Sequence, residues 1–147
     1  MFSERSFTYD SKEAELLLRA AAMKVIDLSF EMGEITTLVQ KDIEDHFNKE
    51  RSPVGKWRKR KDNKTHPILN LSGALKRSIT SKASANIGKL TISIKSDLIY
   101  AKVHNNGMTI RNRGGGYTQM PKRQFAWISK DVRDKSMEII IKGVLDA

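Results

Sequence analysis

The chain has 147 residues, of which 39% are hydrophobic and 30% are charged, and its formal net charge is +10. This length and composition predict one soluble globular domain over residues 1–147. The absence of cysteine excludes a disulfide framework, a thiol nucleophile and a cysteine zinc site. No run of about 20 apolar residues is present to span a membrane, and the first residues lack the build of a signal peptide. We therefore expect no membrane contact and synthesis in an intracellular, reducing compartment.

The charge is unevenly distributed along the chain. Residues 1–50 hold six basic and eleven acidic residues, which is a net charge of −5, and residues 51–130 hold eighteen and two, which is +16. Residues 131–147 hold three basic and four acidic residues, which is a net charge of −1, so the three parts together give +10. An acidic first part followed by a basic middle favours either nucleic-acid binding or docking of the head of one subunit on the middle of another.

Residues 11–49 are predicted to be helical. Asp10 followed by Glu13 resembles a capping box. Apolar residues then recur at close to helical spacing, namely Leu28, Met32, Ile35, Val39, Ile43 and Phe47. Gly33 either divides the region into two helices or only weakens a single one. A single long helix would pack partly against a neighbouring subunit, whereas two antiparallel helices would share one core, and both arrangements stay open.

Residues 50–70 are predicted to form a basic connector, which begins where Ser52-Pro53-Val54-Gly55 ends the helix. Its cations cluster around Trp57, and they are Lys56, Arg58, Lys59, Arg60 and Lys61. In a nucleic-acid interpretation these cations neutralise phosphates while Trp57 stacks on a base. In the alternative, Trp57 anchors the connector to the core and the cations stay solvated.

Residues 71–147 are expected to form a small antiparallel sheet and a C-terminal helix. Ser72 is placed to cap a short helix whose Leu75 and Ile79 face inward. Alternating apolar residues predict strands over residues 90–94 and 99–103. The first strand would form a hairpin, closed at Gly88, with a strand over residues 78–84, and the second would pair on its other side. The fold class is therefore α+β.

The region after residue 103 alternates between turns and ordered segments. Residues 105–107, Asn-Asn-Gly, are typical of a sharp reversal that needs positive φ. The glycine-rich loop over residues 111–116, with Arg111 and Arg113, has no apolar side chain, so we expect it to become ordered on a partner. After Pro121, a C-terminal helix is predicted to begin near residues 125–128, and Phe125 is predicted to be a core anchor.

No constellation of catalytic or metal-binding residues is evident. The histidines His46, His66 and His104 stand in unrelated contexts, with no His-Glu-x-x-His pattern for zinc. Three consecutive glycines at 114–116 are not followed by the Gly-Lys-Ser/Thr of a phosphate-binding loop. His104 lies on a predicted strand face shared with Tyr100 and Lys102. We expect His104 to be structural and that face to be either partly exposed or at a contact. We expect a protein that is not an enzyme and that needs no cofactor and no metal.

Four elements, in order, resemble one family. Gly55-Lys56-Trp57 resembles its Gly-Trp lead-in, and residues 71–79, Leu-Ser-Gly-Ala-Leu-Lys-Arg-Ser-Ile, resemble its Thr-Gly-x-Leu-x-x-Ser element. Residues 100–107, Tyr-Ala-Lys-Val-His-Asn-Asn-Gly, resemble Tyr-Ala-x-Ile-His-Gln-x-Gly, and residues 120–125, Met-Pro-Lys-Arg-Gln-Phe, resemble Pro-Ala-Arg-x-Phe. The family is that of the phage virion morphogenesis proteins, which includes the Mu G-like tail-completion proteins of tailed phages and prophages. The resemblance covers roughly residues 34–147, with Lys122 in place of Ala and Ser72 in place of Thr.

The resemblance implies a structural role in tail completion or head–tail joining, on a tail-terminator-like α+β subunit. It implies protein–protein contacts in a homo-oligomeric ring, for which a hexamer would match the symmetry of a tail tube. The implied partners are the tail tube protein and head-completion or connector proteins. The protein would act in the host cytoplasm during assembly and then in the tail or neck of the virion, with DNA in the ring's lumen. The motif residues carried over are Trp57, Ser72, Gly73, Leu75, Tyr100, Ala101, His104, Gly107, Pro121, Arg123 and Phe125. The alternative is a DNA-binding module that uses the cluster over residues 56–64 and the loop with Arg111 and Arg113.

Overall fold

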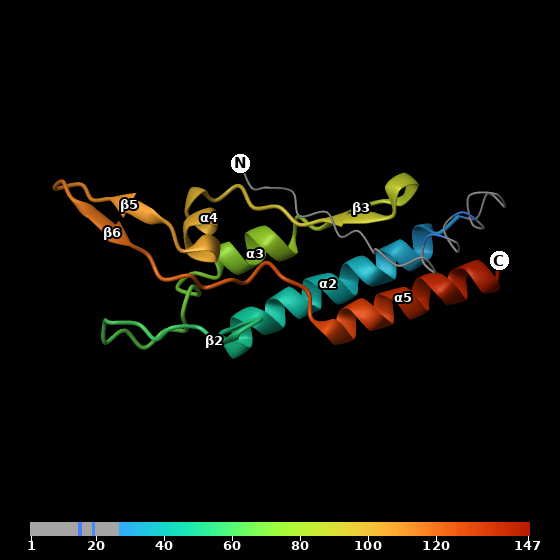
Figure 1. Cartoon of the computed structure of the whole chain (residues 1–147), viewed down its shortest axis with the longest axis horizontal. Coiled ribbons are helices and arrows are strands. Elements are labelled where there is room, and N and C mark those ends of the chain that lie inside the picture. The colour runs from blue at the N-terminus through green and yellow to red at the C-terminus, as the bar shows by residue number, and fades with distance from the viewer. Residues whose placement is uncertain (1–14, 16–18, 20–26) are drawn as a thin grey trace.

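Two antiparallel helices form the long axis of the molecule (Figure 1). Helix α2 spans Ser29–Lys49 and helix α5 spans Lys130–Leu145. The computed structural model describes Glu15, Arg19 and residues 27–147. The predicted capping box at Asp10 and most of the earlier part of the helical region over residues 11–49 lie outside the described residues. Within them, the two long helices lie side by side over most of α5.

Helix α2 presents the predicted apolar face to the core. All six predicted positions are buried, and Ile43 and Phe47 have no exposed surface. Gly33 does not interrupt the helix. The helix ends at Lys49 because Glu50 adopts the left-handed conformation, with φ of 48°, and its N–H caps the carbonyls of His46 and Phe47. A tight hairpin of β1 (Arg51–Ser52) and β2 (Gly55–Lys56) follows, where the sequence predicted only the end of the helix.

Helix α3 (Ala74–Thr80) packs on α2. Leu75 and Ile79 are buried, which confirms the predicted inward face. Gly73, with φ of 69°, takes the N-cap position, and Ser72 lies one residue earlier, where its hydroxyl accepts a weak hydrogen bond from the N–H of Ala74 at 3.4 Å.

The predicted strand over residues 78–84 is wrong over most of its length. Ser78 belongs to helix α3, and the strand β3 covers only Ser84–Asn86. Because Leu75 and Ile79 are four residues apart and both buried, the helical period continues through this segment. Strand β3 does pair with β4 (Thr91–Ser93), around a short 3₁₀ helix over Ile87–Lys89 that contains Gly88.

The predicted strand over residues 99–103 is also wrong, because this segment is helix α4 (Ile99–Asn106). Ile99, which the alternating pattern places in the core, is 93% exposed, whereas Ala101 and Asn105 are buried. Ala101 and Asn105 are four residues apart, so the inward face follows the helical period. Gly107 caps the end of helix α4 with a positive φ of 69°, as the predicted reversal requires. Asn105 and Asn106, which were expected in the same reversal, belong to the helix and have no positive φ.

The glycine-rich segment after α4 forms the turn of a hairpin. Strands β5 (Thr109–Arg111) and β6 (Tyr117–Gln119) form an antiparallel hairpin. Backbone bonds from Asn112 N–H to the Gly116 carbonyl and from Gly115 N–H to the Asn112 carbonyl close its turn. Backbone hydrogen bonds therefore supply the order that apolar side chains do not. The hairpin points away from the α2–α5 pair (Figure 1).

In the described part of the chain, three two-stranded antiparallel sheets accompany the helices, rather than the single small sheet expected. The α+β class and the C-terminal helix are confirmed. Helix α5 begins at Lys130, a few residues later than predicted, because Phe125 and Ile128 are buried in an extended approach to the helix.

The aromatic core joins the connector and the C-terminal part of the chain to α2. Phe47 stacks on Phe125 with ring centroids 5.1 Å apart and meets Trp57 edge-on at 5.6 Å. Trp57 is 4% exposed, and its indole N–H donates to the Gln124 carbonyl at 3.1 Å. The interpretation of Trp57 as an anchor is confirmed, since its ring has no free face for a nucleic-acid base.

A buried polar cluster fixes the start of α5 on α2. Asp42 accepts a hydrogen bond from the N–H of Ser129 at 2.7 Å and lies 3.3 Å from Nε2 of His46. The fully buried His46 ring stacks on Trp127 at 3.9 Å, and its Nδ1 lies 3.1 Å from the Phe125 carbonyl. Burial raises the pKa of Asp42, but the neighbouring His46 ring and the hydrogen bond from Ser129 outweigh this and hold the pKa below the ordinary value of 3.8.

We expect Phe125→Ala to destabilise the fold by about 3–5 kcal/mol, because it removes a fully buried ring from a close-packed core. The measurement is the free energy of unfolding in urea. Phe30→Ala is the matched control, because Phe30 is 80% exposed and its loss should change stability by about 0.5 kcal/mol or less. Equal unfolding curves for Phe125→Ala and the unchanged protein would contradict the anchor role.

We expect Asp42→Asn to lower the free energy of unfolding by about 1–3 kcal/mol at neutral pH, because hydrogen bonds to a buried carboxylate are lost. The pKa of Asp42 is lowered in the folded state, so its stabilisation is fully present above the unfolded value and is lost as pH falls through the folded pKa. The difference in stability between the two proteins should therefore narrow below about pH 3.8. Urea unfolding at several pH values measures this, and a difference that widens towards acid would contradict it.

A basic cavity as the candidate functional site

One cavity of about 610 Å³ gathers residues from four stretches that are far apart in the sequence. The stretches are the basic loop over residues 58–66, the start of α3 with the residues before it, one face of α4, and the segment over residues 118–123. We call this the basic cavity. The predicted residues that line it are Arg58, Lys59, Arg60, Lys61, Ser72, Gly73, Leu75, Tyr100, His104, Pro121 and Arg123.

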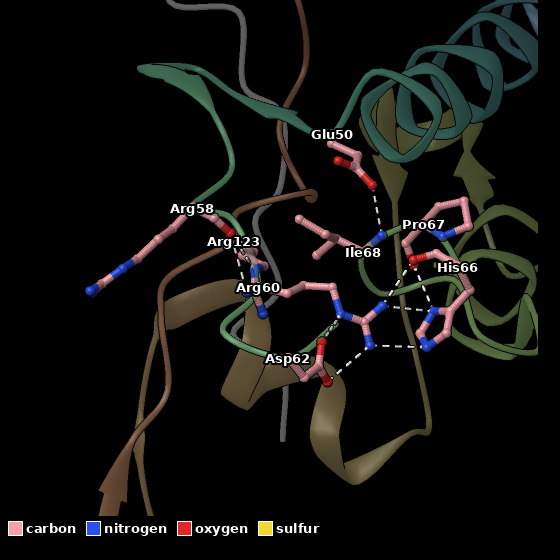
Figure 2. A network of polar contacts seen from close by, with 8 residues as sticks. All are labelled: Glu50, Arg58, Arg60, Asp62, His66, Pro67, Ile68 and Arg123. Atoms are coloured by element: carbon pink, nitrogen blue, oxygen red, sulfur yellow. Dashed lines mark hydrogen bonds and ion pairs between the residues drawn. The ribbon is translucent and has the colours of Figure 1, made fainter. Parts of the chain in front are cut away.

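Arg60 folds the basic loop back on itself, as Figure 2 shows. Its guanidinium donates to both carboxylate oxygens of Asp62, at 2.7 and 3.3 Å, and to the His66 carbonyl at 2.9 Å. It also lies 2.9 and 3.0 Å from the two ring nitrogens of His66. These hydrogen bonds lower the pKa of Asp62. Most of the hydrogen-bonding capacity of Arg60 is thus used within the loop, so Arg60 shapes the cavity wall.

Arg123 ties the loop to helix α4. Its backbone N–H donates to the His104 carbonyl at 2.8 Å. Its guanidinium donates through Nε and Nη2 to the Arg58 carbonyl, at 3.3 and 3.2 Å (Figure 2). Burial and the nearby Arg60 lower the pKa of Arg123, yet an arginine keeps its charge at neutral pH. A positive charge is therefore held against a backbone carbonyl at the bottom of the loop.

The far end of the loop is attached to the end of α2. Glu50 accepts a hydrogen bond from the N–H of Ile68 at 2.6 Å (Figure 2), and the Ile68 side chain is buried. The Glu50 carbonyl also accepts from the N–H of Trp57 at 2.6 Å. Glu50 therefore holds both ends of the basic connector against the core.

The cavity has a strong excess of positive charge. Its lining holds six Lys and Arg residues and one acidic residue, Asp62. Among the described residues, Arg58, Lys59 and Lys61 form no salt bridge, and all three are exposed. Leu71 and Tyr100, also in the lining, are 76% and 43% exposed. A ligand that carries both acidic and apolar groups suits this combination.

Tyr100 and His104 share one face, but as helical neighbours four residues apart rather than as residues of a strand. Their ring centroids are 6.2 Å apart, and Lys102 points elsewhere because two residues correspond to about 200° on a helix. Burial, and next the charge of Arg123, lower the pKa of His104, so its ring is neutral at neutral pH. Its Nδ1 is a buried atom with no hydrogen-bond partner among the described residues.

The remaining predicted residues lie outside the basic cavity. Trp57, Ala101 and Phe125 are buried in the core. Gly107 lies at the base of the β5–β6 hairpin, where a Cβ would approach the Lys122 backbone nitrogen to 2.7 Å. Three exposed cations lie on hairpins, namely Lys56, Arg111 and Arg113.

Sequence reasoning missed Asn105. Its buried side-chain oxygen accepts hydrogen bonds from the N–H groups of Phe125 and Ala126, at 3.1 and 3.0 Å. It thereby attaches α4 to the segment that carries Arg123. Asn105 was assigned to a turn because Asn and Gly follow it. The four-residue spacing of Ala101 and Asn105 is the signal that places it on the inward face of a helix.

The described residues contain neither a metal-binding cluster nor a membrane-spanning helix. No group of three or more His, Asp or Glu side chains there is arranged to hold a metal ion. No helix in the described part is both long and apolar enough to cross a membrane.

We expect Arg123→Lys to loosen the basic loop without unfolding the protein. A lysine ammonium is a point charge and does not reproduce the two-pronged contact of the guanidinium with the Arg58 carbonyl. Hydrogen exchange of the backbone amides over residues 58–62 should become faster, while the melting temperature falls by less than in Phe125→Ala. Lys122→Ala, at the exposed neighbouring position, is the control. Unchanged exchange in Arg123→Lys would show that other contacts hold the loop.

Comparison with known proteins identifies the family from most of the chain. No curated protein and no solved structure matches the chain. The model of the phage virion morphogenesis family matches residues 9–144. The match covers all four elements that resemble this family in the sequence, including those that meet at the basic cavity. The chain belongs to the phage virion morphogenesis family.

Proposed function

We propose that the protein completes the tail or joins it to the head, as one subunit of a ring that works through protein–protein contacts. The observation that carries this proposal is the convergence of motif residues from three family elements on the basic cavity. Ser72, Tyr100 and Arg123 come from different elements, and all three line it. These motif residues lie far apart in the sequence but share one surface. Such an arrangement indicates that they contact the same partner.

The shape and charge of the subunit support a ring. The molecule is elongated (Figure 1), and acidic and basic parts of the chain are separated along the sequence. Contacts between unlike surfaces of identical subunits form rings when the rotation closes. Six-fold symmetry would match a tail tube. Copies of the chain, the tail tube protein and head-completion or connector proteins are the partners we propose, and none of these contacts requires catalysis.

In this proposal the protein assembles in the host cytoplasm and remains in the tail or neck of the virion. DNA passes through the lumen of the ring, where exposed Lys and Arg side chains can lie close to the DNA phosphates. The role is structural, and membership of a virion assembly family supports it.

DNA binding is the second candidate function, and the β5–β6 hairpin is the feature that favours it. The hairpin projects from the helices (Figure 1), carries Arg111 and Arg113, and has no acidic residue. Tyr117 on it is 74% exposed, so it is available to stack on a base. A two-stranded ribbon of this kind can enter a groove of the duplex.

We expect the double variant Arg58→Glu/Lys59→Glu to block head–tail joining. In a phage that encodes this protein, the gene is deleted and either form is supplied from a plasmid. Electron microscopy of the lysates should show separate heads and tails with the variant and joined particles with the unchanged protein. Lys56→Glu/Lys89→Glu, which reverses two exposed charges outside the cavity, is the matched control and should restore joining.

The same proteins separate the two candidate functions. Sedimentation with duplex DNA at two salt concentrations measures DNA binding, which should weaken steeply with salt if phosphate contacts dominate. A strict monomer that binds DNA tightly, together with normal joining by Arg58→Glu/Lys59→Glu, would overturn the assembly function.

A further inference from the structure

A second groove lies at the opposite end of the molecule, between the start of α2 and the end of α5. We call it the acidic end. Its lining includes five acidic residues and a single lysine, Lys142. The five acidic residues are Asp27, Glu31, Glu34, Glu138 and Asp146. In Figure 1 the start of α2 and the end of α5 lie together near the end marked C, whereas the loop that follows β2 lies beyond the opposite ends of these two helices.

The acidic end also exposes apolar side chains. Phe30, in the groove, is 80% exposed, and Leu145, close to it in the last turn of α5, is 72% exposed. Large apolar side chains that are exposed next to a charged groove are typical of a contact surface. The acidic end therefore combines negative charge with apolar groups, as the basic cavity combines positive charge with Leu71 and Tyr100.

One carboxylate at the acidic end has an incomplete set of partners. Glu31 packs against Gly143 so closely that a Cβ there would lie 2.7 Å from its side chain. Its Oε2 is buried and has no hydrogen-bond partner among the described residues. A buried carboxylate oxygen without a donor is costly, so Glu31 adds negative charge to the groove wall. The carboxylates that a neighbouring molecule can reach are the exposed ones, namely Asp27, Glu34, Glu138 and Asp146.

We propose that the acidic end of one copy docks in the basic cavity of the next copy. The two surfaces match in both charge and apolar character: six cations against one acid in the cavity, and five acids against one cation at the acidic end. Arg58, Lys59 and Lys61 are exposed and form no salt bridge with the described residues of their own subunit, so we infer that they pair with the carboxylates of the neighbour. The contact is heterologous, because each copy uses two different surfaces, and repetition of it gives a ring or a filament. This inference rests on the proposed function, since it names the contact from which the ring is built.

Charge reversal on one side at a time is the first test. The cavity variant is Arg58→Glu/Lys61→Glu, and the acidic-end variant is Glu34→Lys/Glu138→Lys. All four side chains are exposed, so each variant should fold, which circular dichroism checks. Sedimentation velocity over a range of concentrations should show self-association of the unchanged protein and at least about tenfold weaker association of each variant, because like charges then face each other. Lys56→Glu/Lys89→Glu is the control and should associate normally.

The chain with all four substitutions identifies which surfaces meet. If the cavity of one copy binds the acidic end of the next, reversing both surfaces restores opposite charges and should restore association. If the basic cavities of two copies met each other instead, the four-substitution chain would place like charges opposite each other, and its copies would not associate. A mixture of the two double variants should also associate, and high salt should weaken every one of these contacts. Failure of the four-substitution chain to recover would overturn the inference.

Other outcomes separate this inference from the proposed function. An unchanged protein that stays monomeric at all concentrations would contradict docking between copies. Normal self-association by the cavity variant would also contradict docking between copies. If that variant nonetheless blocked head–tail joining, the proposed function would stand, with a different partner in the cavity. Loss of binding to duplex DNA with unchanged self-association would assign the cavity to nucleic acid instead. A variant that does not associate but still joins heads to tails would contradict the ring itself.

Discussion

The structure depends on the way Phe125 is held. Its ring stacks on Phe47 of α2, its N–H donates to Asn105 of α4, and its carbonyl accepts from His46 of α2. A fully buried residue that satisfies its ring, its donor and its acceptor with three separate partners has a single stable position. Because the same residue connects α4 to the approach of α5, it sets how the C-terminal part of the chain lies on the long helix.

The basic cavity follows from this anchor. Arg123 stands two residues before Phe125, and the intervening Gln124 accepts the hydrogen bond of the Trp57 indole. The loop that carries Arg58 is thus held from both sides, by Trp57 in the core and by Arg123 at its carbonyl. Six cations gathered in one cavity repel one another, and this repulsion has to be offset by the core contacts that hold their backbone. The apolar core therefore supplies the free energy that keeps a charged surface in one shape.

The antiparallel packing of α2 and α5 determines where the acidic residues lie relative to the basic loop. The two helices are antiparallel, so the start of one lies beside the end of the other, and carboxylates from both meet at one end of the molecule. The basic loop begins soon after α2 ends, which places the cations about one helix length away. A subunit with opposite charges at its two ends carries two unlike surfaces. Repeated head-to-tail contacts between identical subunits require such a pair of surfaces.

Residues with a clear period or a clear chemical constraint were predictable from the sequence. The buried face of α2, the inward Leu75 and Ile79, the anchoring Trp57 and Phe125, and the positive φ of Gly107 depend on local spacing or on the properties of one residue. The family was also predictable, because its four elements are short, local and in order. Segments over 78–84 and 99–103 were misassigned, because a few alternating residues fit a strand and a single helical turn equally well.

Tertiary contacts determined the secondary structure of those two segments and brought together the residues of the basic cavity. The four-residue spacing of Ala101 and Asn105 fits the inward face of a helix, but the alternation over residues 99–103 fits a strand as well. The core and the backbone of Phe125 decide for the helix, because they offer these two residues partners. The meeting of Ser72, His104 and Arg123 in one cavity depends on contacts between residues tens of positions apart. By itself the sequence determined the charge of each part, the family and the core anchors, since these are properties of the residues. Only the folded chain decided that the basic residues and the family's motif residues share one surface, because that depends on long-range packing.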